Sequence, residues 1–256
     1  MNENDDAVFK PSDYVRYVAE NKKVPRESIK VPKELIVTYQ KPTYEYTKKL
    51  IDGKQVEWWR YEKRPPFCVG RFNNVEVGLC LFWIGAPAAV ILLEELITCG
   101  AKKIFEVGTG GGLQSVLNLG DIIVAKEAIR DEGTSNHYLS PEVEVESSRF
   151  LRERLVKHLS EKKIKHFVGP VWSTDGVYRE SRSKLVKFRD AGVLAVNMET
   201  SAVFAVAKFR RVKAASAQVI SDILAENGWI KADGNHSIRA SSDILMKAVL
   251  EVLSKN

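Results

Sequence analysis

Apolar residues follow two different spacings along most of this chain. They recur at every second position over residues 75–81, which predicts a β-strand, and at helical spacing over residues 88–98, which predicts a helix that ends before Gly100. This alternation continues toward the carboxyl end and predicts a single α/β domain with a mixed central sheet flanked by helices. Further strands are predicted over residues 104–107, 121–125, 166–168, 193–196 and 214–220, and further helices over residues 150–159, 198–209 and 241–253.

Polar clusters follow three of these predicted strands. They are the glycine-rich residues 108–112, the segment 197–199 and the pair 221–222. In an α/β sheet, ligands bind beyond the carboxyl ends of the strands. We therefore expect the three clusters to converge on one site.

The glycine run after the strand 104–107 has several interpretations. A strand entering clustered glycines can expose backbone N–H groups that cradle an anion. The dinucleotide pattern G-x-G-x-x-G fails, because Leu113 stands where the last glycine is required. An acid-x-G-x-G-x-G pattern beginning at Glu106 fits methyltransferases that use S-adenosylmethionine, but Asp121 lies before the next strand rather than after it. A tight turn without a ligand is a further possibility.

The first 64 residues differ in composition from the rest of the chain. Residues 21–64 contain 12 Lys and Arg against 6 Asp and Glu, a surplus equal to the net charge of +6 for the whole chain. Several aromatic residues interleave with these charges, so we expect residues 1–64 to form a basic, aromatic arm packed on a domain of residues 65–256. The arm is compatible with a solvated surface, an anion site or a subunit contact. No nucleic-acid motif accompanies the basic charge, which disfavours a nucleic-acid partner.

Three cysteines, Cys68, Cys80 and Cys99, lack the spacing of metal ligands or of a C-x-x-C pair. We expect reduced thiols in a cytoplasmic protein and no bound metal. The most apolar stretch, residues 75–99, is interrupted by glycines, a proline and two glutamates, so no membrane span is predicted.

Several short segments occur in the order of a known family: residues 84–88, 107–113, 120–124, 131–138, 172–180, 197–199 and 219–222. With these segments, residues 65–256 resemble the nucleoside phosphorylases of the purine nucleoside and uridine phosphorylase superfamily. The glycine-aspartate-proline phosphate loop of that family is not found in the first 64 residues.

The resemblance implies a nucleoside phosphorylase-like fold and phosphorolysis of a purine ribonucleoside or uridine. Phosphate attacks C1′ of the nucleoside, and the products are the free base and ribose 1-phosphate. No cofactor is implied besides phosphate as co-substrate. A homo-oligomer built from dimers, possibly a hexamer, is implied as well.

The resemblance also assigns roles to residues at the phosphate and the ribose. Thr109 corresponds to the hydroxyl that binds phosphate, together with the backbone of Gly108. Glu199 corresponds to the carboxylate that binds the ribose hydroxyls, and Met198 packs beneath the sugar. An acid at position 199 could instead serve only to interact with the positive end of the following helix.

At the base, the resemblance gives two opposing indications. Asp222 corresponds to the acid that acts near N7 in purine-cleaving members, which favours a purine. Arg179, which lies with Thr174 and Tyr178 where the family has base-facing residues, could donate to a uracil carbonyl. Asp222 as a cap of the next turn, and Arg179 as a surface residue, are the structural alternatives.

Glu106 departs from the family pattern. Phosphorylases of the family carry an arginine three residues before the loop hydroxyl, and a carboxylate beside phosphate would repel it. The hydrolytic relatives also lack this arginine, so a nucleosidase that uses water is the nearest rival. In the family, a neighbouring subunit contributes a phosphate arginine. Arg64 matches that position best, with Lys63 and Arg60 nearby.

Overall fold

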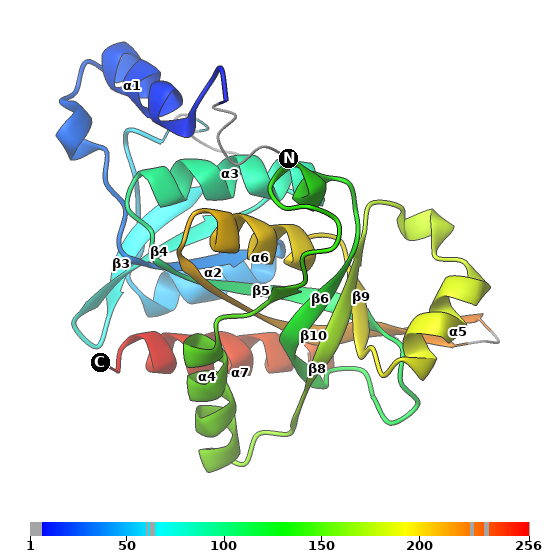
Figure 1. The fold of residues 1–256 in the computed structure, drawn as a ribbon. Helices are drawn as coiled ribbons and strands as arrows, with labels where there is room; N and C mark the ends of the chain where they lie inside the picture. Colours follow the sequence, from blue (N-terminus) through cyan, green and yellow to red (C-terminus); the bar gives the residue numbers. More distant parts are fainter. Residues whose placement is uncertain (1–6, 60, 62–64, 226–227, 233–235, 256) are drawn as a thin grey trace.

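The computed structural model describes residues 7–59, 61, 65–225, 228–232 and 236–255. The chain forms one mixed sheet with helices on both of its faces, as the alternating pattern predicts (Figure 1). The strands are β1 (Glu34–Thr38), β2 (Lys54–Gln55), β3 (Phe67–Phe72), β4 (Val75–Leu81), β5 (Lys103–Gly112), β6 (Ile122–Asp131), β7 (Val145–Glu146), β8 (His166–Thr174), β9 (Ala195–Asn197), β10 (Lys213–Ala225) and β11 (Gly228–Lys231). The helices are α1 (Pro11–Lys22), α2 (Lys41–Leu50), α3 (Ala86–Thr98), α4 (Arg149–Glu161), α5 (Arg182–Asp190), α6 (Thr200–Phe209) and α7 (His236–Leu253), with short 3₁₀ helices η1 (Arg26–Ser28), η2 (Thr134–His137) and η3 (Val177–Arg179).

The strand order in the sheet is β11-β10-β6-β8-β9-β5-β1-β4-β3-β2, and β7 pairs with β6. In addition, β10 pairs with β5. The strands β5, β10, β6, β8 and β9 therefore form a closed ring, from which β1, β4, β3 and β2 extend as an open sheet. The predicted α/β fold with a mixed sheet is confirmed.

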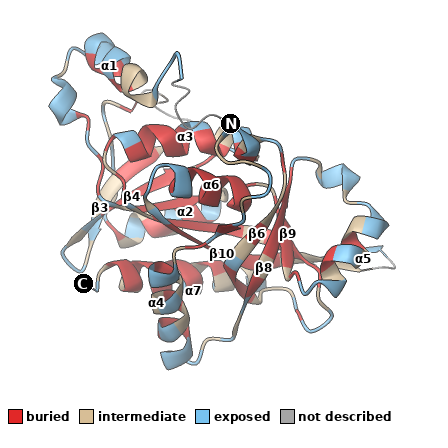
Figure 2. Ribbon diagram, viewed as in Figure 1, coloured by how far each residue is buried: buried red, intermediate tan, exposed pale blue. Residues whose placement is uncertain are grey.

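Two cores lie on opposite faces of the sheet. One face is covered by α3 and α6, and the other by α2, α4 and α7 (Figure 1). α6 is buried from Thr200 to Ala207, which agrees with its apolar sequence and its position between the sheet and α3 (Figure 2). Pro87 stands in the first turn of α3, where its missing N–H costs no hydrogen bond.

The amino-terminal segment contributes a central strand to the sheet. β1 runs parallel to both β4 and β5 and lies between them. Leu35, Ile36 and Val37 have no exposed surface. An outer arm therefore ends before β1 rather than at residue 64. The sequence did not reveal β1, because its short apolar run lies among lysines and prolines. Before β1, the described residues form α1 and η1, and α1 packs on α3.

Among the described residues, no helix combines the length and the apolar character needed to cross a membrane. The three cysteines are free and buried.

Candidate active site

The glycine-rich segment is not a turn but the second half of β5. This strand continues to Gly112 and stays paired with β10 along its whole length. On its other edge, β1 pairs up to Val107 and β9 pairs at Gly111 and Gly112. Within the described chain, residues 108–110 therefore have no strand partner on that edge. The backbone N–H groups of β5 that we expect to bind an anion could therefore do so at this opening between β1 and β9.

Glycine is needed at position 110 because neighbouring groups approach the backbone closely. A Cβ atom there would lie 2.6 Å from Oε1 of Gln218 and 2.8 Å from the carbonyl oxygen of Val196. At Gly108, the nearest atom to a Cβ would be in the Tyr39 ring, at an ordinary 3.4 Å. The glycines thus allow β9 and the side chains of β10 to close over β5.

Glu106 is buried on the α6 side of β5. One of its oxygens accepts a hydrogen bond from the hydroxyl of Tyr39 and the other from that of Thr200, both at 2.7 Å. Burial raises the pKa of Glu106, and these hydrogen bonds oppose the increase. Gln218 donates to the Thr200 hydroxyl at 2.9 Å, and the Ser216 hydroxyl lies 3.2 Å from it. Glu106 is therefore the centre of a buried polar network.

Thr109 lies on the opposite face of β5 from Glu106, because successive side chains in a strand alternate. Its hydroxyl accepts a hydrogen bond from Nε2 of Gln40 at 3.2 Å, and Gln40 in turn accepts one from Thr38 at 3.3 Å. The Glu106 carboxylate and the Thr109 hydroxyl therefore have different partners on opposite faces of the strand, whereas the sequence suggested that they are adjacent. Arg64, with Lys63 and Arg60, lies outside the described residues.

Glu199 lies between β9 and α6, at the amino-terminal end of that helix. Its carboxylate accepts hydrogen bonds from the backbone N–H of Gly85 at 2.7 Å and of Met198 at 3.1 Å. Burial, with a contribution from the nearby Glu106 charge, raises the pKa of Glu199 to about 7. Gly85 has a φ of +99°, a conformation that favours glycine and directs its N–H at the carboxylate.

Asn197 shapes the turn that carries Glu199. Its Oδ1 accepts hydrogen bonds from the Ser173 hydroxyl at 2.7 Å and from the backbone N–H groups of Glu199 and Thr200 at 3.1 Å. The sequence motif includes Asn197, but its role in fixing the helix start is apparent only from the structure.

Asp222 follows a bulge in β10, which extends beyond its predicted end and forms a hairpin with β11. One oxygen of Asp222 accepts from the Ser221 hydroxyl and the other from the indole N–H of Trp229, both at 2.7 Å. Burial and the charge of Asp222 together raise the pKa of the nearby Glu180 to about 7. Sequence reasoning gave no role to Trp229 or Glu180. Trp229 stands in none of the quoted segments, and Glu180 ends the segment 172–180, where nothing in the sequence indicates that it lies near Asp222.

The other predicted base-facing residues lie around η3. Thr174 is buried at the end of β8, and its hydroxyl accepts a hydrogen bond from the backbone of Gly176 at 3.3 Å. Tyr178 is 97% exposed and Arg179 is exposed as well. In this conformation, Glu180 is the residue of the segment whose pKa is raised by the Asp222 charge.

The three polar clusters do lie together. Ser221 contacts the carbonyl of Gly110 at 3.4 Å, and an oxygen of Asp222 would lie 3.3 Å from a Cβ on Gly111. β9, which leads into Glu199, pairs with the same part of β5. Within the described ranges, no three His, Cys, Asp or Glu side chains are grouped to hold a metal ion. The arrangement offers buried carboxylates beside an open strand edge, which suits a polar organic ligand with a hydroxyl-rich part.

Comparisons with known proteins agree with this architecture. The guanosine phosphorylase of Halorubrum lacusprofundi is 30% identical over 167 residues, which is 65% of this chain and 69% of the relative. A DeoD-type purine nucleoside phosphorylase of Shewanella oneidensis is 26% identical over 188 residues, 73% of this chain and 78% of the relative. A uridine phosphorylase structure from Vibrio fischeri superposes with a TM-score of 0.80 at 26% identity, and the match covers 90% of this chain and 94% of the other. The family model described as the phosphorylase superfamily matches residues 37–254, and the chain therefore belongs to that superfamily.

Proposed function

We propose that the protein is a nucleoside phosphorylase that converts a purine ribonucleoside and phosphate into a free base and ribose 1-phosphate. The observation that carries the proposal is the buried Glu199 carboxylate, bound by Gly85 and set beside the open edge of β5. The names of the similar proteins, which include guanosine, purine nucleoside and uridine phosphorylases, support the reaction. The family match also removes the support for a methyltransferase.

In the proposed reaction, a phosphate oxygen forms a bond to C1′ while the bond from C1′ to the base nitrogen breaks. The bonding electrons leave with the base, and the sugar gains positive charge in the transition state. The Glu199 carboxylate stabilises this charge and accepts hydrogen bonds from the ribose hydroxyls, with Met198 beneath the sugar. Its negative form is therefore the active one.

The departing base needs a proton. Asp222 already accepts one hydrogen bond at each of its two oxygens. Burial and the Asp222 charge raise the pKa of the neighbouring Glu180 to about 7, so Glu180 is partly protonated near neutral pH. We assign proton supply to N7 of a purine to this Asp222–Glu180 pair. Arg179, Tyr178 and Thr174 are assigned to the walls of the base site.

Phosphate is assigned to the Thr109 hydroxyl and the Gly108 backbone, with no cofactor. The hydrogen bond from Gln40 to Thr109 would have to rearrange to admit it. Because Glu106 is held on the other face of β5 by Tyr39 and Thr200, its carboxylate need not touch the anion. Arg64 from a neighbouring subunit is proposed as the phosphate arginine, which makes the active form a homo-oligomer.

A panel of inosine, guanosine, adenosine and uridine, each with and without phosphate, tests the function. We expect base release only when phosphate is present, with ribose 1-phosphate as the second product and with purines cleaved faster than uridine. Base release that is equally fast without phosphate would identify a nucleosidase instead. Absence of release from all four would contradict both enzymatic assignments.

The pH profile gives a further prediction. Because the negative form of Glu199 and the protonated form of Glu180 are both required, kcat/KM should peak near pH 7, rising as Glu199 loses its proton and falling as Glu180 loses its own. Glu106→Gln removes a neighbouring charge that contributes to raising the pKa of Glu199, so the rising limb should move to lower pH. Glu153→Gln, an exposed change on α4, is the control and should leave the limb in place. An unchanged limb in Glu106→Gln would contradict the coupling.

A further inference from the structure

The segment that carries the base-facing residues is fastened at both of its ends. It runs from the end of β8 through η3 to the start of α5, over residues 174–181. We propose that the ion pair between Asp131 and Lys184 positions this segment for nucleoside binding. The proposal deepens the proposed function, on which it rests, and makes Asp131 and Lys184 positioning residues that need not touch the substrate.

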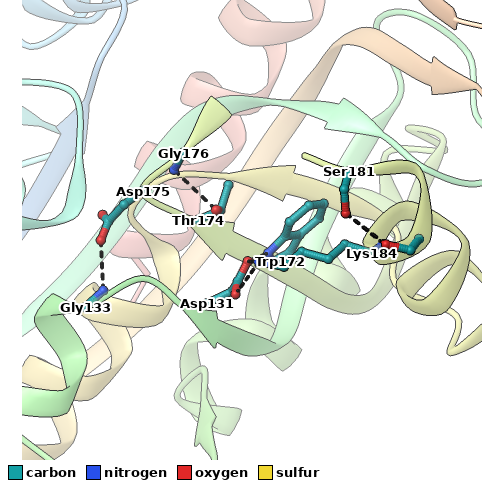
Figure 3. A network of polar contacts seen from close by, with 9 residues as sticks. Asp131, Gly133, Trp172, Thr174, Asp175, Gly176, Ser181 and Lys184 are labelled. Carbon is teal, nitrogen blue, oxygen red and sulfur yellow. Dashed lines mark hydrogen bonds and ion pairs between the residues drawn. The ribbon is translucent and has the colours of Figure 1, made fainter. Parts of the chain in front are cut away.

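The pair joins the sheet to α5. Asp131 is the last residue of β6 and lies opposite Thr174, the last residue of β8. Nζ of Lys184 lies 2.8 Å and 2.7 Å from the two carboxylate oxygens of Asp131. The indole N–H of the buried Trp172 donates to one of the same oxygens at 3.0 Å (Figure 3). The hydrogen bond from Trp172 thus holds the Asp131 carboxylate in position for its ion pair with Lys184.

The lysine acts at the start of its helix. Ser181 caps α5, and its hydroxyl accepts a hydrogen bond from the backbone N–H of Lys184 at 3.3 Å (Figure 3). One turn later, Phe188 packs on Trp172 with ring centroids 4.8 Å apart. The first turn of α5 is therefore held to the sheet by the ion pair and the second by the aromatic contact.

The opposite end of the segment has its own attachment. A carboxylate oxygen of Asp175 accepts a hydrogen bond from the backbone N–H of Gly133 at 2.8 Å, and the N–H of Gly176 donates to Thr174 (Figure 3). Between these attachments, Tyr178 and Arg179 are exposed. The two attachments therefore limit where this exposed part of the segment can lie.

The ion pair is suited to positioning more than to global stability. The side chains of Lys184 and Asp131 are 44% and 25% exposed, and ion pairs at this level of exposure contribute little to the stability of a whole domain. Loss of the lysine should leave the Trp172–Phe188 contact and the sheet intact. The consequence should therefore be confined to the mobility of the base-facing segment.

Steady-state kinetics of Lys184→Met test the proposal. This variant retains most of the aliphatic stem and loses the charge. We expect the KM for the nucleoside to rise about fivefold, with kcat and the KM for phosphate within about twofold of wild type, because uniform binding of the base is weakened. Lys184→Arg should restore the KM. Lys187→Met, on the same helix, removes a lysine that lies over the Phe188 ring and should leave the KM unchanged.

Limited trypsin digestion supplies a readout that does not depend on catalysis. Cleavage after Arg179 should be faster in Lys184→Met and in Asp131→Asn than in wild type, at an unchanged thermal midpoint. An unchanged nucleoside KM together with unchanged cleavage would overturn the proposal. An equal loss of kcat on every substrate, together with a lowered thermal midpoint, would also overturn the proposal, because this result indicates a merely structural role. If the wild type cleaves no nucleoside, the proposed function fails, while digestion still tests the attachment itself.

Discussion

Glu199→Gln is expected to lower kcat/KM for every cleaved nucleoside by about 10²–10³-fold, the size of effect found when one preorganised electrostatic group is removed. The amide keeps an oxygen that can accept the hydrogen bond from Gly85, but it has no charge to stabilise a cationic sugar. The fold should be preserved, because the raised pKa of about 7 means that burying this charge is already unfavourable. Initial rates and a thermal unfolding curve together check both parts.

The matched control is Glu153→Gln, the same change on an exposed part of α4. It should alter neither the rates nor the unfolding midpoint. Full activity of Glu199→Gln on every substrate would remove Glu199 from the mechanism. A large loss of folding stability would leave the activity loss without a specific cause and would contradict the expectation that the fold is preserved.

Gly110→Ala should both destabilise the fold and abolish activity. The new methyl group would meet Oε1 of Gln218 at 2.6 Å and the backbone oxygen of Val196 at 2.8 Å. Gln218 is tied to Thr200, and Val196 is held in the ladder between β9 and β5. Relief of the clash must therefore separate these strands or break the network at Glu106, at a cost of about 1–3 kcal/mol in the free energy of unfolding.

Gly108→Ala provides the comparison for stability. It is the same substitution two residues away in the same strand, and its methyl group would meet only the Tyr39 ring at 3.4 Å. Chemical denaturation of the two variants should show a clear loss for Gly110→Ala and a change close to zero for Gly108→Ala. Equal stabilities would show that β9 is not packed on β5 in the way described.

Segments with a regular spacing of apolar residues were predictable, because this spacing alone indicates a strand or a helix. The alternation over residues 75–81 corresponds to β4, and the apolar helix before Gly100 corresponds to α3. β1 escaped prediction because its apolar run, Leu35 to Val37, is only three residues long. The second half of β5 escaped because glycine is depleted in strands, and here it is favoured by the close approach of β9 and Gln218.

The candidate site was predictable only in part. Motifs pointed to Glu199, Thr109 and Asp222, and their clusters do lie together. The partners of Glu106 could not be found in the same way, because Tyr39 and Thr200 lie 67 and 94 residues from it in the sequence. The face of β5 on which Glu106 lies relative to Thr109 could not be predicted either. That inference needs a strand that continues through residue 109, whereas a loop was predicted after residue 107.

The closed ring of β5, β10, β6, β8 and β9 fixes the relative positions of its strands, whereas segments outside the ring can vary more freely. A strand in a closed ring cannot slip by one residue unless its neighbours slip too, so the spacing between the ends of these strands is set by the ladders. The groups assigned to the sugar stand on or directly beside the ring. The segment assigned to the base, residues 174–181, leaves the ring. Substitutions in that segment could therefore change which base is accepted while the sugar remains held in the same frame.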